Sequence, residues 1–282
     1  MAIILHLNPT IVVKASTPLW LAICAAATLS LASCQKHQDD VTVKEDISAE
    51  TIGQIKALGF SATNAKVVDG GVVVEGDMLL SKEMLNSKPD GKFLRVGDDE
   101  QYRTYNLVRG LPRTLTVSIS SRFPAGYAAA ADEAIRRYNA ANLQLRFQRI
   151  SSGGADLPIQ YADDLGPGVL GQSGGFPSGG NPAPGFKLVP SVIGSQTINA
   201  VATIMAHEMG HCIGFRHTDY RNRAYSCGDV PNPNEGASDI GAIRIPGTPS
   251  APDPDSWMLA CVGNNENRPF NSNDVIALNY LY

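Results

Sequence analysis

The sequence predicts an α+β fold, with a mixed, twisted sheet in a main domain and a small unit before it. Segments with alternating apolar residues, which are typical of strands, are interleaved with two longer segments of helical spacing. Beyond Gly214 the chain becomes rich in proline, which indicates a loop-rich C-terminal subdomain. Far upstream, Asp69-Gly70-Gly71 lies between apolar residues and predicts a hairpin in a separate N-terminal unit.

The chain begins with a segment typical of export, and residues 1–33 are predicted to be a signal peptide. Lys14 is the only Lys, Arg, Asp or Glu before the apolar run 19–31, which is shorter than the roughly 20 residues of a membrane span. The run ends in Leu-Ala-Ser-Cys at Cys34, which resembles the lipobox of bacterial lipoproteins. The resemblance implies a lipid on Cys34 and a place in the bacterial cell envelope, on the outer membrane or cell surface. An ordinary secretory signal cut near Ala32 is the alternative.

Residues 34–108 are predicted to form a tether and the small N-terminal unit. Within them, 48–59 has the spacing of a short helix, and 65–74 reads as two strands around the hairpin turn. The segment 101–111 has an exposed, basic character, so we expect the boundary with the main domain, 109–282, near residue 108.

The main domain contains one long helix, a second helix with an unusual histidine pattern, and a short helix at the end of the chain. The segment 166–184 is rich in Gly and Pro and is expected to be a loop or an edge segment next to a cleft. Ser272-Asn273-Asp274 is expected to cap the last helix. In chain order the predicted elements are a strand at 114–120, a helix at 125–141, strands at 143–150, 157–161 and 186–193, and helices at 199–212 and 275–281.

The second helix carries His-Glu-x-x-His-x-x-Gly-x-x-His between His207 and His217. His207 and His211 are four residues apart and share one face of a helix. Gly214 adopts positive φ most easily, so it can end the helix and bring His217 back as a third ligand. Three neutral imidazoles leave an open position for water on one Zn²⁺ per chain. Glu208 is placed to take a proton from that water.

The alternative is that these three histidines are ordinary core or surface residues. The chain contains five histidines, and three of them fall within eleven residues at ligand spacing. The extension beyond the first five motif residues, through Gly214 to His217, makes coincidence a weak explanation.

The composition is that of a soluble globular protein, with 43% hydrophobic residues and 18% charged residues. No basic run or aromatic-interleaved patch indicates nucleic acid as a partner. Several acidic residues could hold calcium, although a solvated surface explains them better: Asp156, Asp163, Asp164, Asp229 and Asp239.

The histidine motif and the order of elements resemble the metzincin clan of metallopeptidases, most closely the bacterial dual-action HEIGH metallopeptidases. The resemblance implies a zinc endopeptidase acting on proteins or peptides, with substrate paired to the strand at 186–193. The clan also carries a methionine turn below the metal, for which Met258 is the candidate, with a plain core methionine as the alternative. Thr218 stands where astacins have Glu, and Ala260 stands where astacins have a tyrosine ligand, so that ligand is not implied.

Residues 74–80, Val-Glu-Gly-Asp-Met-Leu-Leu, resemble the prosegment motif of astacins. In that family an aspartate takes the open position of the metal, so the resemblance implies that Asp77 keeps the protein latent. A cut near Arg103 or Arg109 would then release the N-terminal unit. The alternative is a structural Gly-Asp turn between two strands.

The cysteines left after processing and lipidation are Cys212, Cys227 and Cys261. Cys227 and Cys261 lie in the irregular C-terminal part and are the expected disulfide, whereas Cys212 fits a small buried residue of the helix. A rival hypothesis is a catalytically silent surface lipoprotein that serves as a binding module. Its structural zinc would need a fourth protein ligand, either a reduced cysteine or Asp77.

Overall fold

The computed structural model describes residues 47–58, 60, 62, 64–74, 76–86, 101–230, 234–235, 242–249 and 251–282. All of them belong to the compact unit Glu45–Tyr282. The predicted signal peptide, Cys34 and the tether lie outside the described residues. No helix within the described ranges is both long and apolar enough to cross a bilayer.

A mixed sheet of eight strands forms the framework, in the order β1-β2-β3-β8-β9-β7-β5-β6. The main-domain part has four mutually parallel strands and one antiparallel strand, β8. These strands are β5 (Arg113–Ile119), β6 (Leu145–Arg149), β7 (Leu157–Tyr161), β8 (Gly171–Ser173) and β9 (Phe186–Leu188). The sheet and its helices confirm the predicted α+β fold.

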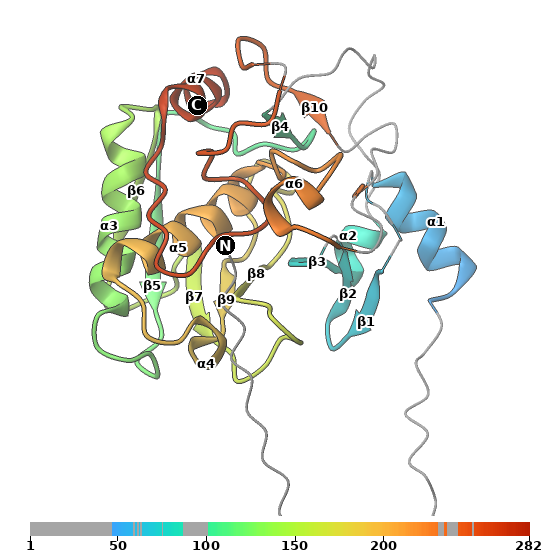
Figure 1. Cartoon of the computed structure of the whole chain (residues 1–282), viewed down its shortest axis with the longest axis horizontal. Coiled ribbons are helices and arrows are strands. Elements are labelled where there is room, and N and C mark those ends of the chain that lie inside the picture. The colour runs from blue at the N-terminus through green and yellow to red at the C-terminus, as the bar shows by residue number, and fades with distance from the viewer. Residues whose placement is uncertain are drawn as a thin grey trace, which may run out of the picture. The chain divides into compact units, whose positions relative to one another are not determined.

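Two helices, α3 (Tyr127–Ala140) and α5 (Ile198–Ile213), pack against each other and against the sheet (Figure 1). Their contact is close because alanines on α3, including Ala130 and Ala134, are fully buried there. The Thr197 side chain caps α5 by accepting a hydrogen bond from the backbone of Ala200. The helix that carries the histidine motif is therefore fixed along nearly its whole length.

The small N-terminal unit adds a three-stranded extension to the same sheet. It consists of α1 (Ala49–Ala57), β1 (Lys66–Val68), β2 (Gly71–Val74), β3 (Met78–Ser81) and α2 (Lys82–Leu85). The predicted hairpin is present, since β1 and β2 pair antiparallel around Asp69 and Gly70. The strand β3 pairs with β8 in parallel, through Met78 and Ser173. The N-terminal unit thus covers the outer edge of β8.

The described residues of the C-terminal part contain little regular structure, as the prolines there predict. Its elements are α6 (Ala224–Cys227), β10 (Ile243–Arg244) and α7 (Ser272–Leu281). The strand β10 pairs with β4 (Tyr102–Arg103), which comes before β5 in the chain. The residue that caps α7 is Asn271, one position before the predicted cap, and Asp274 completes a capping box with it.

The structure corrects three further predictions. The expected strand 186–193 ends at Leu188, and the short helix α4 (Pro190–Ile193) follows because proline suits the first turn of a helix. That strand is also interior, between β8 and β7, and cannot pair with substrate. The segment predicted to be exposed begins with the buried residues Gln101 and Tyr102, because it is paired on both sides.

Candidate metal centre

The three histidines of the motif converge on one point. Helix α5 brings His207 and His211 together, with 3.0 Å between their Nε2 atoms. Gly214 follows in the left-handed region at φ 111°, and the chain turns back there. A Cβ on Gly214 would lie 2.8 Å from the Leu107 side chain, so space as well as conformation requires glycine. The turn brings His217 Nε2 to 3.2 Å from His211 Nε2.

The other ring nitrogen of each histidine fixes its tautomer. The Nδ1 atom of His207 lies 3.0 Å from the carbonyl oxygen of Trp257, and that of His211 lies 2.8 Å from the carbonyl oxygen of Phe215. A carbonyl oxygen only accepts, so each Nδ1 carries the proton and donates. The Nε2 atom of each neutral ring then carries a lone pair, and the Nε2 atoms of His207 and His211 face each other at 3.0 Å. Such an arrangement is repulsive unless a cation lies between them.

A carboxylate completes the group. Asp77 Oδ2 lies 3.1 Å from His217 Nε2 and 3.8 Å from the Nε2 atoms of His207 and His211. Burial raises the pKa of Asp77, but the neighbouring imidazoles outweigh burial and hold it well below the ordinary value. The four possible ligand atoms lie within 4.8 Å of one another. The N-terminal unit therefore supplies one member of the set.

This donor set fits a divalent metal ion. Two nitrogens bound to tetrahedral zinc at about 2.0–2.1 Å lie about 3.3 Å apart. The Nε2 separations of 3.0 and 3.2 Å around His211 are close to that value. Burial lowers the pKa of His211 to about 4, which keeps this imidazole neutral and ready to bind a metal. Three imidazole nitrogens with one carboxylate oxygen are ligands that zinc accepts.

Glu208 lies beside the histidines, buried against the strand β8. A Cβ on Gly171 would lie 2.6 Å from Glu208 Oε1, so the glycine makes room for the carboxylate. Burial, followed by repulsion from Asp77, raises the pKa of Glu208 well above its ordinary value, although the backbone of Ser173 offers a hydrogen bond. Its Oε2 has no hydrogen-bond partner among the described residues. A raised pKa and a free acceptor suit a group that exchanges protons.

Glu208 and His207 open onto a cavity of about 450 Å³. Its lining includes apolar side chains of α5, of the segment before β8 and of the segment after Met258, among them Ile204, Leu170 and Val262. Asp77 and Lys66 of the N-terminal unit also line it. A chain segment with an apolar side chain would fit this space beside the metal centre.

Met258 packs against α5, which we call the metal helix because it carries His207 and His211, and it is fully buried. A Cβ on Gly210 would lie 2.5 Å from the sulfur of Met258. The helix is therefore in direct contact at this glycine with the turn at Trp257 and Met258, which we call the methionine turn. The same turn holds the site from two directions. The carbonyl oxygen of Trp257 accepts from His207, and that of Met258 accepts from the backbone of Thr218.

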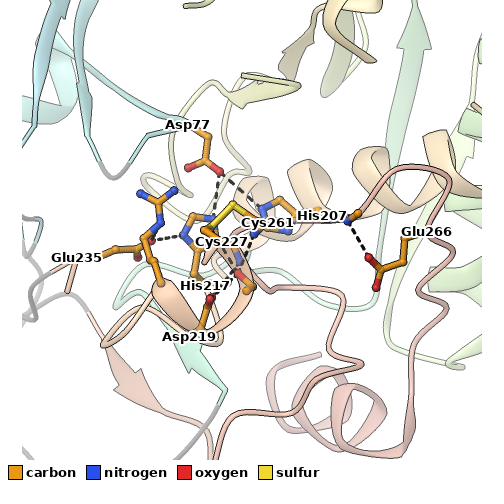
Figure 2. Close-up of a disulfide and its surroundings, with 12 residues drawn as sticks. Asp77, His207, His217, Asp219, Cys227, Glu235, Cys261 and Glu266 are labelled. Atoms are coloured by element: carbon orange, nitrogen blue, oxygen red, sulfur yellow. Dashed lines mark hydrogen bonds and ion pairs between the residues drawn. A yellow bond between two sulfur atoms is a disulfide. The ribbon is translucent and has the colours of Figure 1, made fainter. Parts of the chain in front are cut away.

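One residue of the site was not predicted from the sequence. Glu235 accepts a hydrogen bond from His217 Nδ1, with 2.6 Å between the atoms, and its side chain is 1% exposed. Figure 2 shows Asp77 and Glu235 on opposite sides of the His217 ring. A lone glutamate in a proline-rich loop carries no spacing signal, so the sequence offered nothing that could identify it.

Cys212 is a free, buried cysteine. A disulfide joins Cys227 and Cys261, the pair expected from the sequence (Figure 2). Beside the disulfide, the buried Asp219 accepts from the Ser226 hydroxyl at 2.6 Å and from the backbone of Ala260 at 2.9 Å. The loop after His217 is therefore tied to the segment after Met258 by a covalent bond and by hydrogen bonds. The two walls of the metal site cannot separate easily.

The chain is similar to two solved structures and to one family of metallopeptidases. Two solved structures of myroilysin align with the chain. One is 18% identical, and the alignment covers 61% of this chain and 94% of the myroilysin chain, with a TM-score of 0.41. The other is 15% identical, covers 60% and 82%, and has a TM-score of 0.39. No curated protein matches the chain. The sequence model of the dual-action HEIGH metallo-peptidases matches residues 70–282, a range that includes the three histidines, Glu208 and Asp77, and the chain therefore belongs to this family of metallopeptidases.

Proposed function

We propose that this chain is a zinc endopeptidase of the bacterial cell envelope, anchored by lipid on Cys34 and held latent by its N-terminal unit. One observation carries the catalytic part of the proposal. Three imidazoles with fixed tautomers face one point, and a buried carboxylate, Glu208, with a raised pKa lies beside them. A structural metal site has no use for such a carboxylate.

In the proposed mechanism His207, His211 and His217 hold one Zn²⁺. When bound, zinc supplies a Lewis acid that polarises the scissile carbonyl and makes water a better nucleophile near neutral pH. Glu208 takes the proton from the attacking water and passes it to the leaving amine. Gly171 leaves space for its carboxylate, and the backbone of Ser173 holds it in place. The cavity beside them receives a side chain of the substrate.

Two contacts support latency. Asp77 occupies the position opposite the three imidazoles, where a fourth ligand would exclude water. Without the N-terminal unit β8 would be the edge strand of the main-domain sheet, where an extended substrate would add, and β3 already pairs with β8 there. While the N-terminal unit stays in this position, both the open metal position and the strand edge are taken.

The expected cleavage sites need revision. The peptide bonds around Arg103 lie in β4, paired with β10 on one side and hydrogen-bonded to Gly214 and Arg216 on the other. A cut there would remove support from the turn that carries His217. Arg109 is exposed, but its backbone donates to Gly180, and the same support would leave with the released segment. The proposal therefore keeps Gln101–Arg109 with the protease part.

The first test measures zinc and proteolysis in the same samples of the purified chain, before and after limited trypsin treatment. We expect one zinc per chain and casein cleavage that rises after treatment. Glu208→Gln should keep the zinc and lose cleavage by at least about a hundredfold, the size typical of a general base. The exposed Glu50→Gln variant is the control. Full turnover in Glu208→Gln would disprove the mechanism.

The test of latency is Asp77→Ala in the untreated chain. Loss of the carboxylate should open the fourth position and raise casein cleavage severalfold while zinc stays bound. Asp69→Ala is the matched control, because Asp69 lies in the β1–β2 turn of the same unit, at the opposite end of β2 from Asp77. Equal activity of Asp77→Ala and the unaltered chain would reject the switch.

The anchor is tested by Cys34→Ala. We expect the unaltered protein in the membrane fraction of a bacterial host and the variant in the soluble exported fraction. Stable anchoring needs more than one acyl chain, and a lipobox implies that several are attached. A variant that remains in the membrane fraction would contradict this part of the proposal.

The second candidate function, a silent binding module, is favoured by Asp77 alone, which closes a four-ligand set. The disulfide removes Cys227 and Cys261 as ligands. Zinc in every form with no cleavage of casein or of a mixed peptide library, Asp77→Ala included, would favour this candidate.

A further inference from the structure

The three histidines differ in what holds them. His207 and His211 are four residues apart on α5, so the helix itself sets their directions. His217 comes after the helix has ended at Gly214, and no regular element holds its backbone in the same way. The third position of the set therefore depends on side-chain and loop contacts.

The contact that His217 makes is also of a different kind. The Nδ1 atoms of His207 and His211 donate to backbone carbonyl oxygens, whereas His217 Nδ1 donates to the carboxylate of Glu235 at 2.6 Å. A hydrogen bond to a charged acceptor is stronger than one to a neutral acceptor. A carboxylate also increases the electron density on the imidazole and makes the opposite nitrogen a better ligand.

Glu235 is itself held from two sides. Its backbone N–H donates to the carbonyl oxygen of Tyr220 at 2.8 Å, which ties it to the loop that carries His217. Its Oε1 lies 3.2 Å from Arg223 Nε, and with its side chain 1% exposed the carboxylate is shielded from water. His217 and Arg223 both approach the same oxygen, Oε1, so this oxygen of the buried carboxylate is directed at the imidazole and its charge is balanced by a cation.

We infer that Glu235 is the positioning residue of the metal centre, which fixes the tautomer and direction of His217 and strengthens it as the third ligand. The inference rests on the proposed binding of zinc by the three histidines. Its consequence is that metal affinity depends on a residue that neither touches the metal nor belongs to the histidine motif. Loss of a carboxylate in this role typically weakens metal binding about 10- to 100-fold.

The test is zinc affinity of the full chain, measured by competition with a chelator. We expect Glu235→Ala to weaken binding about 10- to 100-fold, and Glu235→Gln to weaken it less, because the amide oxygen still accepts from Nδ1 without the charge. Asp156→Asn is the matched control. It removes another partly buried carboxylate that pairs with an arginine, its partners Arg113 and Thr116 belong to β5, and it should leave zinc affinity unchanged.

Two further readouts separate positioning from general damage. The melting temperature of each metal-free protein reports stability, and a positioning role predicts that the affinity loss exceeds any loss seen in Asp156→Asn at similar stability. The visible spectrum of the Co²⁺ form reports the geometry of the ligands, and should change in both Glu235 variants. If Glu235→Ala does not fold, Glu235→Gln decides alone.

The outcomes distinguish this inference from the proposed function. An unaltered chain that binds no zinc would disprove both. An unaltered chain that binds zinc tightly, with equal affinity and an equal cobalt spectrum in Glu235→Gln and Glu235→Ala, would overturn the role of Glu235 and leave the proposed function standing.

Discussion

Gly210 lies where the metal helix touches the methionine turn. A side chain there would meet the sulfur of Met258 at 2.5 Å and the indole nitrogen of Trp257 at 3.2 Å. Trp257 also provides the carbonyl oxygen that orients His207. The glycine therefore sets the distance between the helix and the turn, and through that turn it influences the first histidine.

We expect Gly210→Ala to destabilise the protein by about 1–3 kcal/mol, the usual cost of an added methyl group in a packed core. Gly53→Ala is the control, because Gly53 lies in α1 with open space around it. Alanine is the better helix former, so this variant should gain up to about 1 kcal/mol. Thermal unfolding of both variants checks the prediction, and equal effects would show that contact with Met258 is not the cause.

At the same scale, the sequence predicted the residues whose roles depend on local spacing. His207, His211 and His217 were identified because a helix and a glycine turn convert their spacing into a common direction. Glu235 escaped prediction because eighteen residues of irregular chain separate it from its histidine. No periodic pattern connects the two residues, so only the folded structure brings them together.

Helices α3 and α5 are joined by a buried arginine. Arg137 of α3 donates to the Thr203 hydroxyl at 3.0 Å and to the Asn199 carbonyl oxygen at 3.1 Å, both on α5. Glu133 pairs with it from one turn earlier at 3.0 Å. This link holds the metal helix against the rest of the domain.

The charge of Glu133 should contribute to stability in a pH-dependent way. A hydrogen bond from Arg136, opposed by burial and reinforced by Arg137, lowers the pKa of Glu133 from 4.5 to about 2. A depressed pKa stabilises the folded state above pH 4.5, and the contribution is lost as pH falls towards 2. We expect Glu133→Gln to cost about 1 kcal/mol at pH 7, and the difference from the unaltered chain to shrink below pH 4.5. Denaturant unfolding at pH 7, 5 and 3.5 checks both statements, and a constant difference would contradict them.

Elements were predictable where their pattern is long. The helices at α3 and α5 were expected within about two residues of their ends, since each has several turns of regular spacing. The strand β3 was not predicted, because four residues carry too little pattern and its pairing with β8 depends on a partner far along the chain. The short helix α4 was misread as strand because its apolar residues suit either structure, and proline decided the outcome.

Over the whole molecule, the disulfide holds together the irregular part of the chain. Cys227 and Cys261 are separated by 34 residues, and closing a loop of that length removes about 3–4 kcal/mol of entropy from the unfolded state in the simple chain model. Among the described residues between them, the short strand β10 is the regular element. The covalent bond therefore carries stability that hydrogen bonds supply elsewhere in the fold.

We expect the double variant Cys227→Ser and Cys261→Ser to lose about 2–4 kcal/mol. A reducing agent should lower the melting temperature of the unaltered chain towards that of the double variant and leave the variant unchanged. Cys212→Ala, which removes the free buried cysteine, is the control and should still respond to the reducing agent. A chain whose melting temperature ignores reduction would refute this account.

The fold class followed from the order of apolar periodic segments and from the resemblance to metzincins. The disulfide pair followed from the position of Cys227 and Cys261 in the irregular C-terminal part. The position of Gln101–Thr104 did not follow. Its basic and polar residues suggested an exposed linker, but Gln101 reaches Ser256 at 3.1 Å and Asp274 at 2.8 Å. Such contacts between the two ends of a domain leave no local trace in the sequence.

Those contacts also determine when the site can form during biosynthesis. The backbone of Thr104 supports the turn at Gly214, 110 residues later, and Gln101 needs the start of α7 before its own side chain is held. Because a ribosome makes the chain from its N-terminus and distant contacts close slowly, the parts that hold the histidines are complete only after α7 has been synthesised. A nascent or prematurely terminated polypeptide therefore carries the histidine motif without the structure that would let it capture metal from the cell.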